Sequence, residues 1–266
     1  TDQSFLCLSY KDIQKVPVVF LNIGDRKPIS LFGGYFNAAS IDSEGAILFI
    51  NYKLIQTSPL AEIKATFLPD GEKAVSVACC KDVIFALSLN GRLFQSFTRN
   101  SELIFNEVSE LRGVNITNVS GSFWHCFAVS NEGKVFGYGA NDGGRLGAGK
   151  EIEEFEVFTE IESLENIVEA YAGSTHSLFR TCDGKLLACG SNSCGELFLN
   201  SGPSADFFFS PVETMINRDA KLCIAGDTLS SAFIEYFPNG SLLDILEMER
   251  KSIAIPFWND TQKLIV

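Results

Sequence analysis

Short apolar runs alternate with polar turns centred on glycine along most of this chain. The turn glycines are Gly45, Gly91, Gly133, Gly184 and Gly240, and they lie 42 to 56 residues apart. Each lies between two apolar runs of strand length, which is the pattern of a β-hairpin. The Asn-Gly pair at residues 90–91 is the strongest short signal for such a turn. The pattern therefore predicts a series of hairpins at a spacing of roughly fifty residues.

Each of the first four hairpins is followed by a further extended stretch, and another strand leads into the next unit. The following stretches are residues 61–68, 104–111, 155–161 and 207–215. Four strands per repeated unit is the composition of a propeller blade. We therefore predict an all-β fold, a single β-propeller of four-stranded blades.

The predicted units divide the whole chain into one domain, residues 1–266. Five units are predicted at residues 28–73, 74–117, 118–168, 169–219 and 220–258. Strands predicted at 5–10, 16–23 and 263–266 would form a sixth, composite blade from residues 259–266 and 1–27. A ring closed by strands from both termini has no exposed sheet edge between its first and last blades. We expect six blades, and seven if a long interval hides another one.

Two consecutive units are nearly the same sequence. The recurring pairs, each separated by 51 residues, are His125 and His176, Gly133 and Gly184, Gly139 and Gly190, Asn141 and Asn192, and Gly144 and Gly195. A histidine fixed by the repeat is interpreted as a buried hydrogen-bonding group that ties a strand to a neighbouring loop. The glycines suit tight turns with positive φ, and asparagine can bond its own backbone. We interpret all of these as structural repeat positions.

These motifs do not predict a catalytic, metal or cofactor site. Equivalent positions in adjacent blades lie well apart, and no carboxylate or cysteine pattern converges on the two histidines. The Gly-x-Asn-x-x-Gly segments lack the strand-then-helix context of a dinucleotide fingerprint. No nucleophile elbow, Walker loop or zinc-protease motif is present in the sequence. We therefore predict a non-enzymatic protein with no catalytic residues, no metal ligands and no cofactor.

The composition suits a buried core of packed sheets. Of 266 residues, 46% are hydrophobic and 23 are phenylalanine, which fills the space between sheet layers well. Three of the eight cysteines, Cys126, Cys182 and Cys189, lie in strand-like runs, where free cysteine acts as a small buried hydrophobe. No signal segment begins the sequence and no apolar run reaches membrane-spanning length. We expect a cytoplasmic protein, with the nucleus as the alternative, and no membrane span.

The formal net charge of −12 argues against a general affinity for nucleic acid, because phosphate binding needs a basic stripe. No Lys/Arg cluster of useful length is present in the sequence. The acidity is interpreted first as a means of solubility. The second interpretation is an acidic surface that selects a basic partner.

The paired units resemble the repeat of the regulator of chromosome condensation family. Its unit ends in Gly-x-Asn-x-x-Gly-Gln-Leu-Gly, which is matched by Gly139, Asn141, Gly144, Leu146 and Gly147, and again by Gly190, Asn192, Gly195 and Leu197. Arg145 and Glu196 stand where the family usually has Gln, and Phe198 stands for the final Gly. The family's usual ring has seven blades. The resemblance implies a binding function, with no particular partner.

Two aromatic segments are candidates for a partner-binding surface. Phe123 and Trp124 precede His125 in a loop one residue longer than its counterpart in the next unit. Phe207 and Phe208 belong to a run of three phenylalanines, more than an alternating strand needs. Core packing is the first interpretation of both pairs. The alternative is that they are exposed anchors, since aromatic anchors dominate interface energetics.

We predict a scaffold or adaptor that binds a protein partner through loops on one face or in the central funnel. The alternative, implied by the resemblance, is a guanine nucleotide exchange factor for a Ran-like small GTPase. A hydrolase built on a propeller would need a polar cluster in the funnel, and the sequence identifies none.

Overall fold

The structure is a computed structural model that describes residues 5–8, 19–22, 26–33, 37–51, 63, 65–99, 102–199, 206–216, 220–225 and 230–234. These residues form strands together with three single-turn 3₁₀ helices, η1 (Pro69–Gly71), η2 (Ser109–Leu111) and η3 (Asp142–Gly144). None of the helices in this part of the chain has the length or apolar character needed to cross a membrane. The predicted all-β fold is confirmed.

Four antiparallel sheets of four strands follow one another along the chain, and we number them blades 1 to 4. Blade 1 contains β3 (Pro28–Gly33), β4 (Asn37–Asp42), β5 (Ile47–Asn51) and β6 (Ala65–Thr66); blade 2 contains β7 (Ala74–Cys80), β8 (Val83–Ser88), β9 (Leu93–Phe97) and β10 (Asn106–Glu107). Blade 3 contains β11 (Ile116–Gly121), β12 (His125–Ser130), β13 (Val135–Ala140) and β14 (Glu154–Glu160); blade 4 contains β15 (Ile167–Ala172), β16 (His176–Thr181), β17 (Leu186–Ser191) and β18 (Phe207–Glu213). Each blade is therefore a simple meander, with strands in sequence order.

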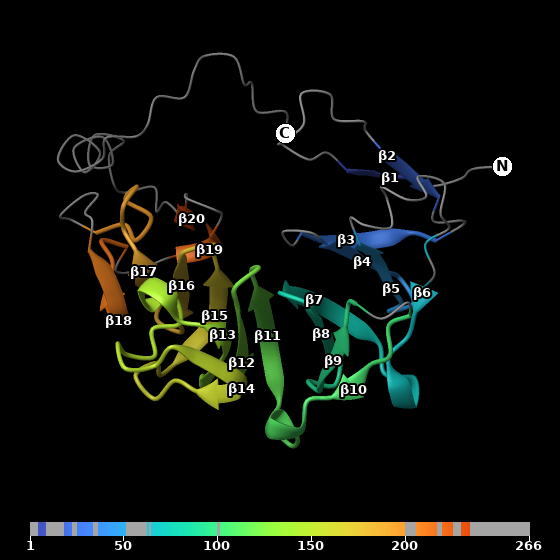
Figure 1. Cartoon of the computed structure of the whole chain (residues 1–266), viewed down its shortest axis with the longest axis horizontal. Coiled ribbons are helices and arrows are strands. Elements are labelled where there is room, and N and C mark those ends of the chain that lie inside the picture. Colours follow the sequence, from blue (N-terminus) through green and yellow to red (C-terminus); the bar gives the residue numbers. More distant parts are fainter. Residues whose placement is uncertain are drawn as a thin grey trace, which may run out of the picture.

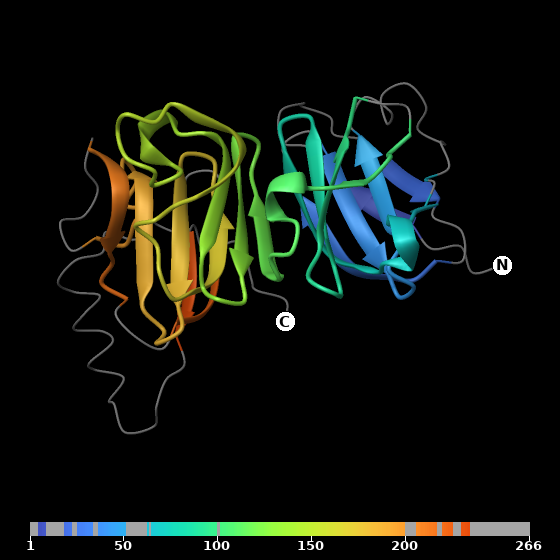
Figure 2. The same ribbon diagram turned by 90° about the horizontal axis from the view of Figure 1, so that it is seen from below.

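The blades lie around a common centre in sequence order, each beside the next (Figure 1). The first strands are innermost, because β11 contacts β7 on one side and β15 on the other. Seen from below, the sheets stand side by side with their strands running between the two ends of the molecule (Figure 2). This is the arrangement of blades in a β-propeller.

Two-stranded sheets lie at both ends of this series of blades (Figure 1). One pairs β1 (Phe5–Leu8) with β2 (Val19–Asn22), within the two strands predicted near the amino terminus. The other pairs β19 (Ala220–Ala225) with β20 (Ser230–Ile234) and packs on blade 4. The predicted hairpin at Gly240 and the closing strand at 263–266 lie outside the described residues. The number of blades and the closure of the ring therefore stay predictions.

The outer strands of blades 1 and 2 are shorter than the sequence predicted. Residues 61–68 and 104–111 were each expected to form a long strand, but β6 and β10 contain only two residues each. In blade 1 the pairing ends at Thr66, and η1 begins three residues later at Pro69. In blade 2 the chain turns into η2 directly after Val108. The outer strands β14 and β18, with seven residues each, follow the prediction closely.

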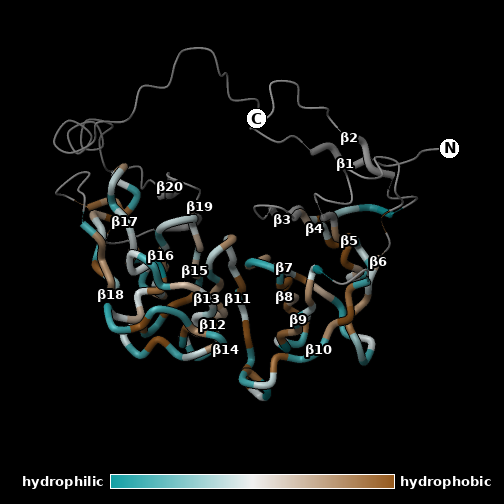
Figure 3. The backbone as a smooth tube through the Cα atoms, viewed as in Figure 1, coloured by the Kyte–Doolittle hydropathy of each residue, from teal (hydrophilic) through white to brown (hydrophobic). Residues whose placement is uncertain are grey.

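Apolar clusters fill the spaces between consecutive blades. Phe94 packs in the cluster between blades 1 and 2, and Phe85 packs between blades 2 and 3. Phe127 and Phe179 meet edge to face between blades 3 and 4, with ring centroids 5.0 Å apart. All four phenylalanines are fully buried. Hydrophobic stretches accordingly coincide with strands and hydrophilic stretches with the peripheral loops (Figure 3). Burial of this area between sheets is the main source of stability for the fold.

The blades have two ends, which we name by their connections. The hairpin end carries the turns between second and third strands, and the loop end carries the other connections within each blade. At the hairpin end, Gly91 adopts φ +77°, and its carbonyl accepts a hydrogen bond from the Ile116 amide of the next blade. Gly45 and Gly133 make the same bond to the next blade. The recurring turn glycines therefore connect blades as well as turning the chain.

Candidate functional site

The loop end of blades 3 and 4 contains the aromatic candidates and the repeated histidines and asparagines, with the glycines at 139, 144, 190 and 195, whereas the turn glycines Gly133 and Gly184 lie at the hairpin end. His125 and His176 begin the second strands β12 and β16, and Asn141 and Asn192 follow the third strands β13 and β17. The aromatic candidates lie at the same end, in the loop before β12 and at the start of β18. The structure thus brings the histidines, the asparagines and the aromatic candidates together.

His125 is fully buried and bonded on both ring nitrogens. The Ser177 hydroxyl donates to the Arg145 carbonyl at 2.7 Å, so it accepts its 2.6 Å hydrogen bond from Nε2 of His125. Nδ1 is then the acceptor for the Ser122 hydroxyl at 3.1 Å. Burial, with Arg145 and His176 adding to it, lowers the pKa of His125 well below its ordinary value. The imidazole is therefore neutral and links β12 of blade 3 to β16 of blade 4.

His176 occupies the equivalent position in blade 4 and is also fully buried. It begins β16, where it pairs with Gly190 as His125 pairs with Gly139. No group of three or more histidine, cysteine or acidic side chains suited to a metal occurs in the described part of the chain.

Gly139 and Gly190 let the third strands pass directly over the loops that precede the histidines. Their φ angles are +96° and +102°, in a region that residues with a side chain rarely adopt. A Cβ atom at Gly190 would lie 2.5 Å from the Thr175 carbonyl oxygen, and one at Gly139 would meet the Trp124 carbonyl. The Ala140 amide also donates to the Trp124 carbonyl, at 2.9 Å.

Asn141 organises the long loop between β13 and β14. Its side-chain amide donates to the carbonyls of Gly149 and Ile152, both at 2.8 Å, and its oxygen accepts the Leu146 amide at 2.9 Å. The side chain is buried, so each of these bonds replaces one to water. This one residue therefore fixes the start, middle and end of the loop.

The remaining motif positions serve the same loops. In blade 4, Asn192 accepts the Leu197 amide at 3.2 Å, and Gly195 has a φ of +83°. In blade 3, a Cβ atom at Gly144 would lie 2.6 Å from both the Phe208 carbonyl oxygen and the Phe209 Cα atom. The glycine at 144 thus lets the loop of blade 3 rest on the outer strand of blade 4.

Trp124 is exposed although its backbone is held on both sides. The Phe123 carbonyl accepts the Lys81 amide of blade 2 at 2.7 Å, and the Trp124 carbonyl accepts the Ala140 amide of its own blade. The Phe123 and Trp124 rings meet edge to face with centroids 4.7 Å apart. Even so, Trp124 is 41% exposed. Core packing, our first interpretation of Trp124, is therefore wrong.

Arg145 lies against the Trp124 ring, with its guanidinium carbon 5.6 Å from the ring centroid. The guanidinium donates to the carbonyls of Asp142 at 2.9 Å and of Ser174 at 3.0 Å. It also lies 3.8 Å from the Asp142 carboxylate. Arg145 therefore holds the indole in place and connects the loops of blades 3 and 4.

Phe207 and Phe208 point to different surroundings. Phe208 pairs with Gly190 and packs half-buried on the cluster beyond blade 4, with Leu197 and Ala188. Phe207 is 57% exposed and lies against η3, where a Cβ atom on Gly143 would be 2.8 Å from its ring. Core packing holds for Phe208 but not for Phe207. The alternation of side chains along β18 explains the difference.

We define the ridge as Phe123, Trp124, Asp142, Arg145 and Phe207. Its members are connected by contacts from Trp124 through Arg145 and Asp142 to Gly143 and Phe207, across blades 3 and 4. Sequence reasoning did not assign a site role to Asp142 or Arg145. Arg145 could have been found from the sequence, because it stands where the family usually has glutamine. It therefore places a cation where the repeat usually has a neutral amide.

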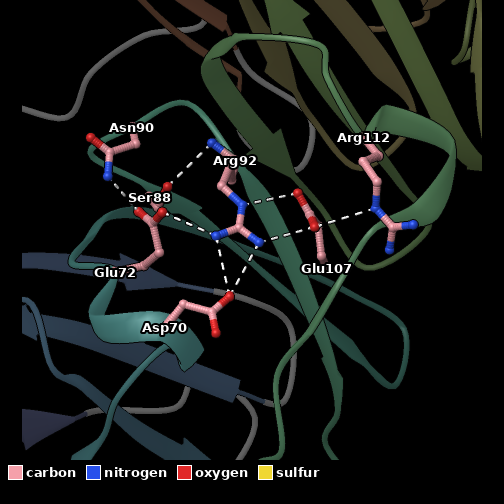
Figure 4. Close-up of polar contacts among 7 residues, drawn as sticks. All are labelled: Asp70, Glu72, Ser88, Asn90, Arg92, Glu107 and Arg112. Carbon is pink, nitrogen blue, oxygen red and sulfur yellow. Dashed lines mark hydrogen bonds and ion pairs between the residues drawn. The ribbon is translucent and has the colours of Figure 1, made fainter.

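A second polar cluster lies at the hairpin end of blade 2 (Figure 4). Arg92 donates to both carboxylate oxygens of Glu107 at 3.0 Å, to Glu72 at 3.2 Å and to Asp70 at 3.4 Å. The hydrogen bonds from Arg92 lower the pKa of Glu107, although burial opposes them. Three carboxylates already engage this one guanidinium. The cluster therefore connects the segment before β7 to β10 and does not present a free binding group.

The buried cysteines are not suited to thiolate chemistry. Burial raises the pKa of both the Cys79 and Cys80 thiols to about 12. Cys126 and Cys189 are buried in strands as the sequence predicted. The prediction for Cys182 is wrong, because β16 ends at Thr181 and Cys182 is exposed in the turn.

Comparison with known proteins identifies the repeats. The family described as regulator of chromosome condensation (RCC1) repeat matches residues 132–180, and a second description of the same repeat matches residues 167–196. These matches span blades 3 and 4, where the paired motifs lie.

Relatives match just under half of the chain. It is 30% identical over 127 residues to the probable E3 ubiquitin-protein ligase HERC3 of Homo sapiens, covering 47% of this chain and 12% of that protein. It is 39% identical over 111 residues to protein RCC2 of Homo sapiens, covering 40% of this chain and 21% of that protein. The chain therefore spans a small part of the length of these relatives.

Among solved structures, Prp20p from Saccharomyces cerevisiae is similar to 93% of this chain, with a TM-score of 0.68 and 14% identity. The match covers 68% of the Prp20p chain, and that structure was reported with its binding properties to Gsp1p and histones. The likeness confirms the β-propeller fold.

Proposed function

We propose that this chain, a divergent β-propeller built from regulator of chromosome condensation repeats, is a non-enzymatic module that binds a protein partner through the ridge. The observation that carries the proposal is Trp124, an exposed indole on a backbone bonded to two blades. Preorganised aromatic anchors bind well because little conformational entropy is lost when a partner docks. The module acts as a scaffold or adaptor in the cytoplasm or nucleus.

Binding is favoured over catalysis by the state of the two histidines. Histidine is the side chain best suited to acid–base chemistry near neutral pH. Both histidines here are fully buried, and His125 uses both ring nitrogens to join two blades. The ligase activity in the name of the HERC3 relative belongs to a protein of which this chain matches 12%. That activity is not part of the proposal.

Nucleotide exchange on a small GTPase is the second candidate. It is favoured by the fold shared with Prp20p, whose reported structure names binding to Gsp1p. The release of fluorescent GDP from a panel of small GTPases, with and without the chain, separates the two candidates. Acceleration by orders of magnitude for one GTPase would establish exchange. If the chain accelerates GDP release from none of the GTPases, exchange is excluded and the adaptor function remains the proposal.

Replacing both exposed aromatics of the ridge, Trp124→Ala with Phe207→Ala, is expected to reduce partner recovery at least tenfold. Loss of a buried aromatic anchor on binding costs about 2 kcal/mol or more per residue. The measurement is quantitative mass spectrometry of proteins purified with the tagged full chain. The matched control is Val75→Ala with Leu89→Ala, two exposed apolar residues at the hairpin end. Equal partner recovery by the wild-type chain and both double variants would refute a role for the ridge.

A further inference from the structure

We propose that the ridge binds a lysine- or arginine-rich segment of its partner. This inference rests on the proposed function and specifies the chemistry of the partner. It is carried by the combination of two exposed aromatic rings with an excess of carboxylates around them.

The loop end of blades 3 and 4 is acidic. The Asp142 side chain is 75% exposed within the ridge, and Asp206 is exposed directly before Phe207. Glu151 and Glu153 are exposed in the loop that Asn141 organises. Among the described residues at the loop end of these two blades, Lys150 is the one exposed cation. The local charge is therefore negative, and it can attract a basic segment and repel an acidic one.

Arg145, the one cation inside the ridge, already donates its hydrogen bonds to groups of this chain. The Arg145 side chain is 11% exposed, and its guanidinium donates to two backbone carbonyls beneath the indole. Asp142 lies beside it and offsets its charge. Arg145 therefore leaves Asp206, Glu151 and Glu153 to attract cations of a partner.

The geometry suits a chain segment more than a single side chain. Trp124 and Phe207 come from different blades and are joined by Arg145, Asp142 and Gly143, so the exposed rings lie along one line of contacts. The methylene stems of lysine and arginine pack on aromatic rings while their charged heads reach neighbouring carboxylates. A partner segment with alternating basic and apolar residues satisfies both requirements.

The test uses the full chain with Trp258→Phe, which leaves Trp124 as its single tryptophan. The probe is a 14-residue peptide in which lysine alternates with alanine and leucine, and the matched probe has glutamine at every lysine. We expect the lysine peptide to change Trp124 emission and to bind at least tenfold more tightly than the glutamine peptide. Its affinity should fall steeply as salt rises, because the charges are exposed.

Two double variants locate the binding. Asp206→Asn with Glu153→Gln, at two exposed positions beside the ridge, should weaken the lysine peptide at least tenfold. Glu162→Gln with Glu165→Gln removes the same charge from exposed positions at the hairpin end, and should change affinity less than twofold. Equal binding of the two peptides, or equal weakening by the two double variants, would overturn the inference. If the peptides fail but the ridge variant still loses its partner, the proposed function stands and the basic partner is wrong.

Discussion

Replacing Gly139 with alanine is expected to lower the free energy of unfolding by about 3–5 kcal/mol. The φ of +96° at this position costs a residue with a Cβ atom about 1–3 kcal/mol. The new methyl group would also meet the Trp124 carbonyl oxygen and lie 3.0 Å from the Cα atom of His125. Both neighbours are backbone atoms of the same blade, so neither can move away as a flexible side chain would.

Gly149→Ala is the matched control, since Gly149 has a φ of +92° but no atom within 4 Å of a Cβ atom built on it. Gly149→Ala should lower the free energy of unfolding by about 1–3 kcal/mol, the cost of a positive φ for a residue with a Cβ atom. It should show no added cost from steric overlap. Urea denaturation of both variants measures the difference. Equal destabilisation by Gly139→Ala and Gly149→Ala would mean that the close approach of β13 to the Trp124 loop has no energetic consequence.

Replacing Asn141 with aspartate is expected to lower the free energy of unfolding by about 3–5 kcal/mol at pH 8. The substitution keeps the size of the side chain but puts an oxygen where the amide now donates to the carbonyls of Gly149 and Ile152. Two donors are lost and a carboxylate faces two carbonyl oxygens in a buried site. The loop that carries Asp142 and Arg145 should loosen as well.

The destabilisation caused by Asn141→Asp should become smaller as the pH is lowered. Burial raises the pKa of the introduced carboxyl above its unfolded value of about 3.9, so the folded state binds a proton that the unfolded state has released. The unfolding free energy of Asn141→Asp should therefore rise, relative to the wild type, between pH 8 and pH 5. Asn131→Asp, at an exposed turn position, is the control and should change stability by less than about 0.5 kcal/mol at either pH. If the destabilisation by Asn141→Asp does not depend on pH, the side chain at position 141 is not held in a buried site.

The sequence predicted the elements that depend on repeated local chemistry. Gly139 and Gly190 recur because the third strand passes over the same loop in each blade, and this requirement is visible as spacing. The lengths of β6 and β10 were predicted less well, because pairing in both strands stops after two residues and the chain then leads into η1 or η2. Apolar runs alone do not indicate where pairing stops.

The site could be predicted only in part, because exposure is decided by tertiary contacts. Trp124 and Phe208 are both aromatic and lie at or next to strands, yet one is on the surface and the other packs on blade 4. The direction of each ring depends on loop length and on strand register, which a single sequence does not specify. The Arg92 cluster joins residues of three separate segments, so sequence spacing gave no sign of it.

Site-specific photocrosslinking in cells determines whether a partner binds at the ridge. A benzophenone amino acid replaces Trp124 or Phe207 on the ridge, or Leu89 or Glu165 at the hairpin end, one position at a time in the full chain. All four positions are exposed, so a crosslinker at any of them can reach a partner. We expect protein adducts from positions 124 and 207 and none from positions 89 and 165. Adducts confined to the hairpin end would show that the partner does not bind at the ridge.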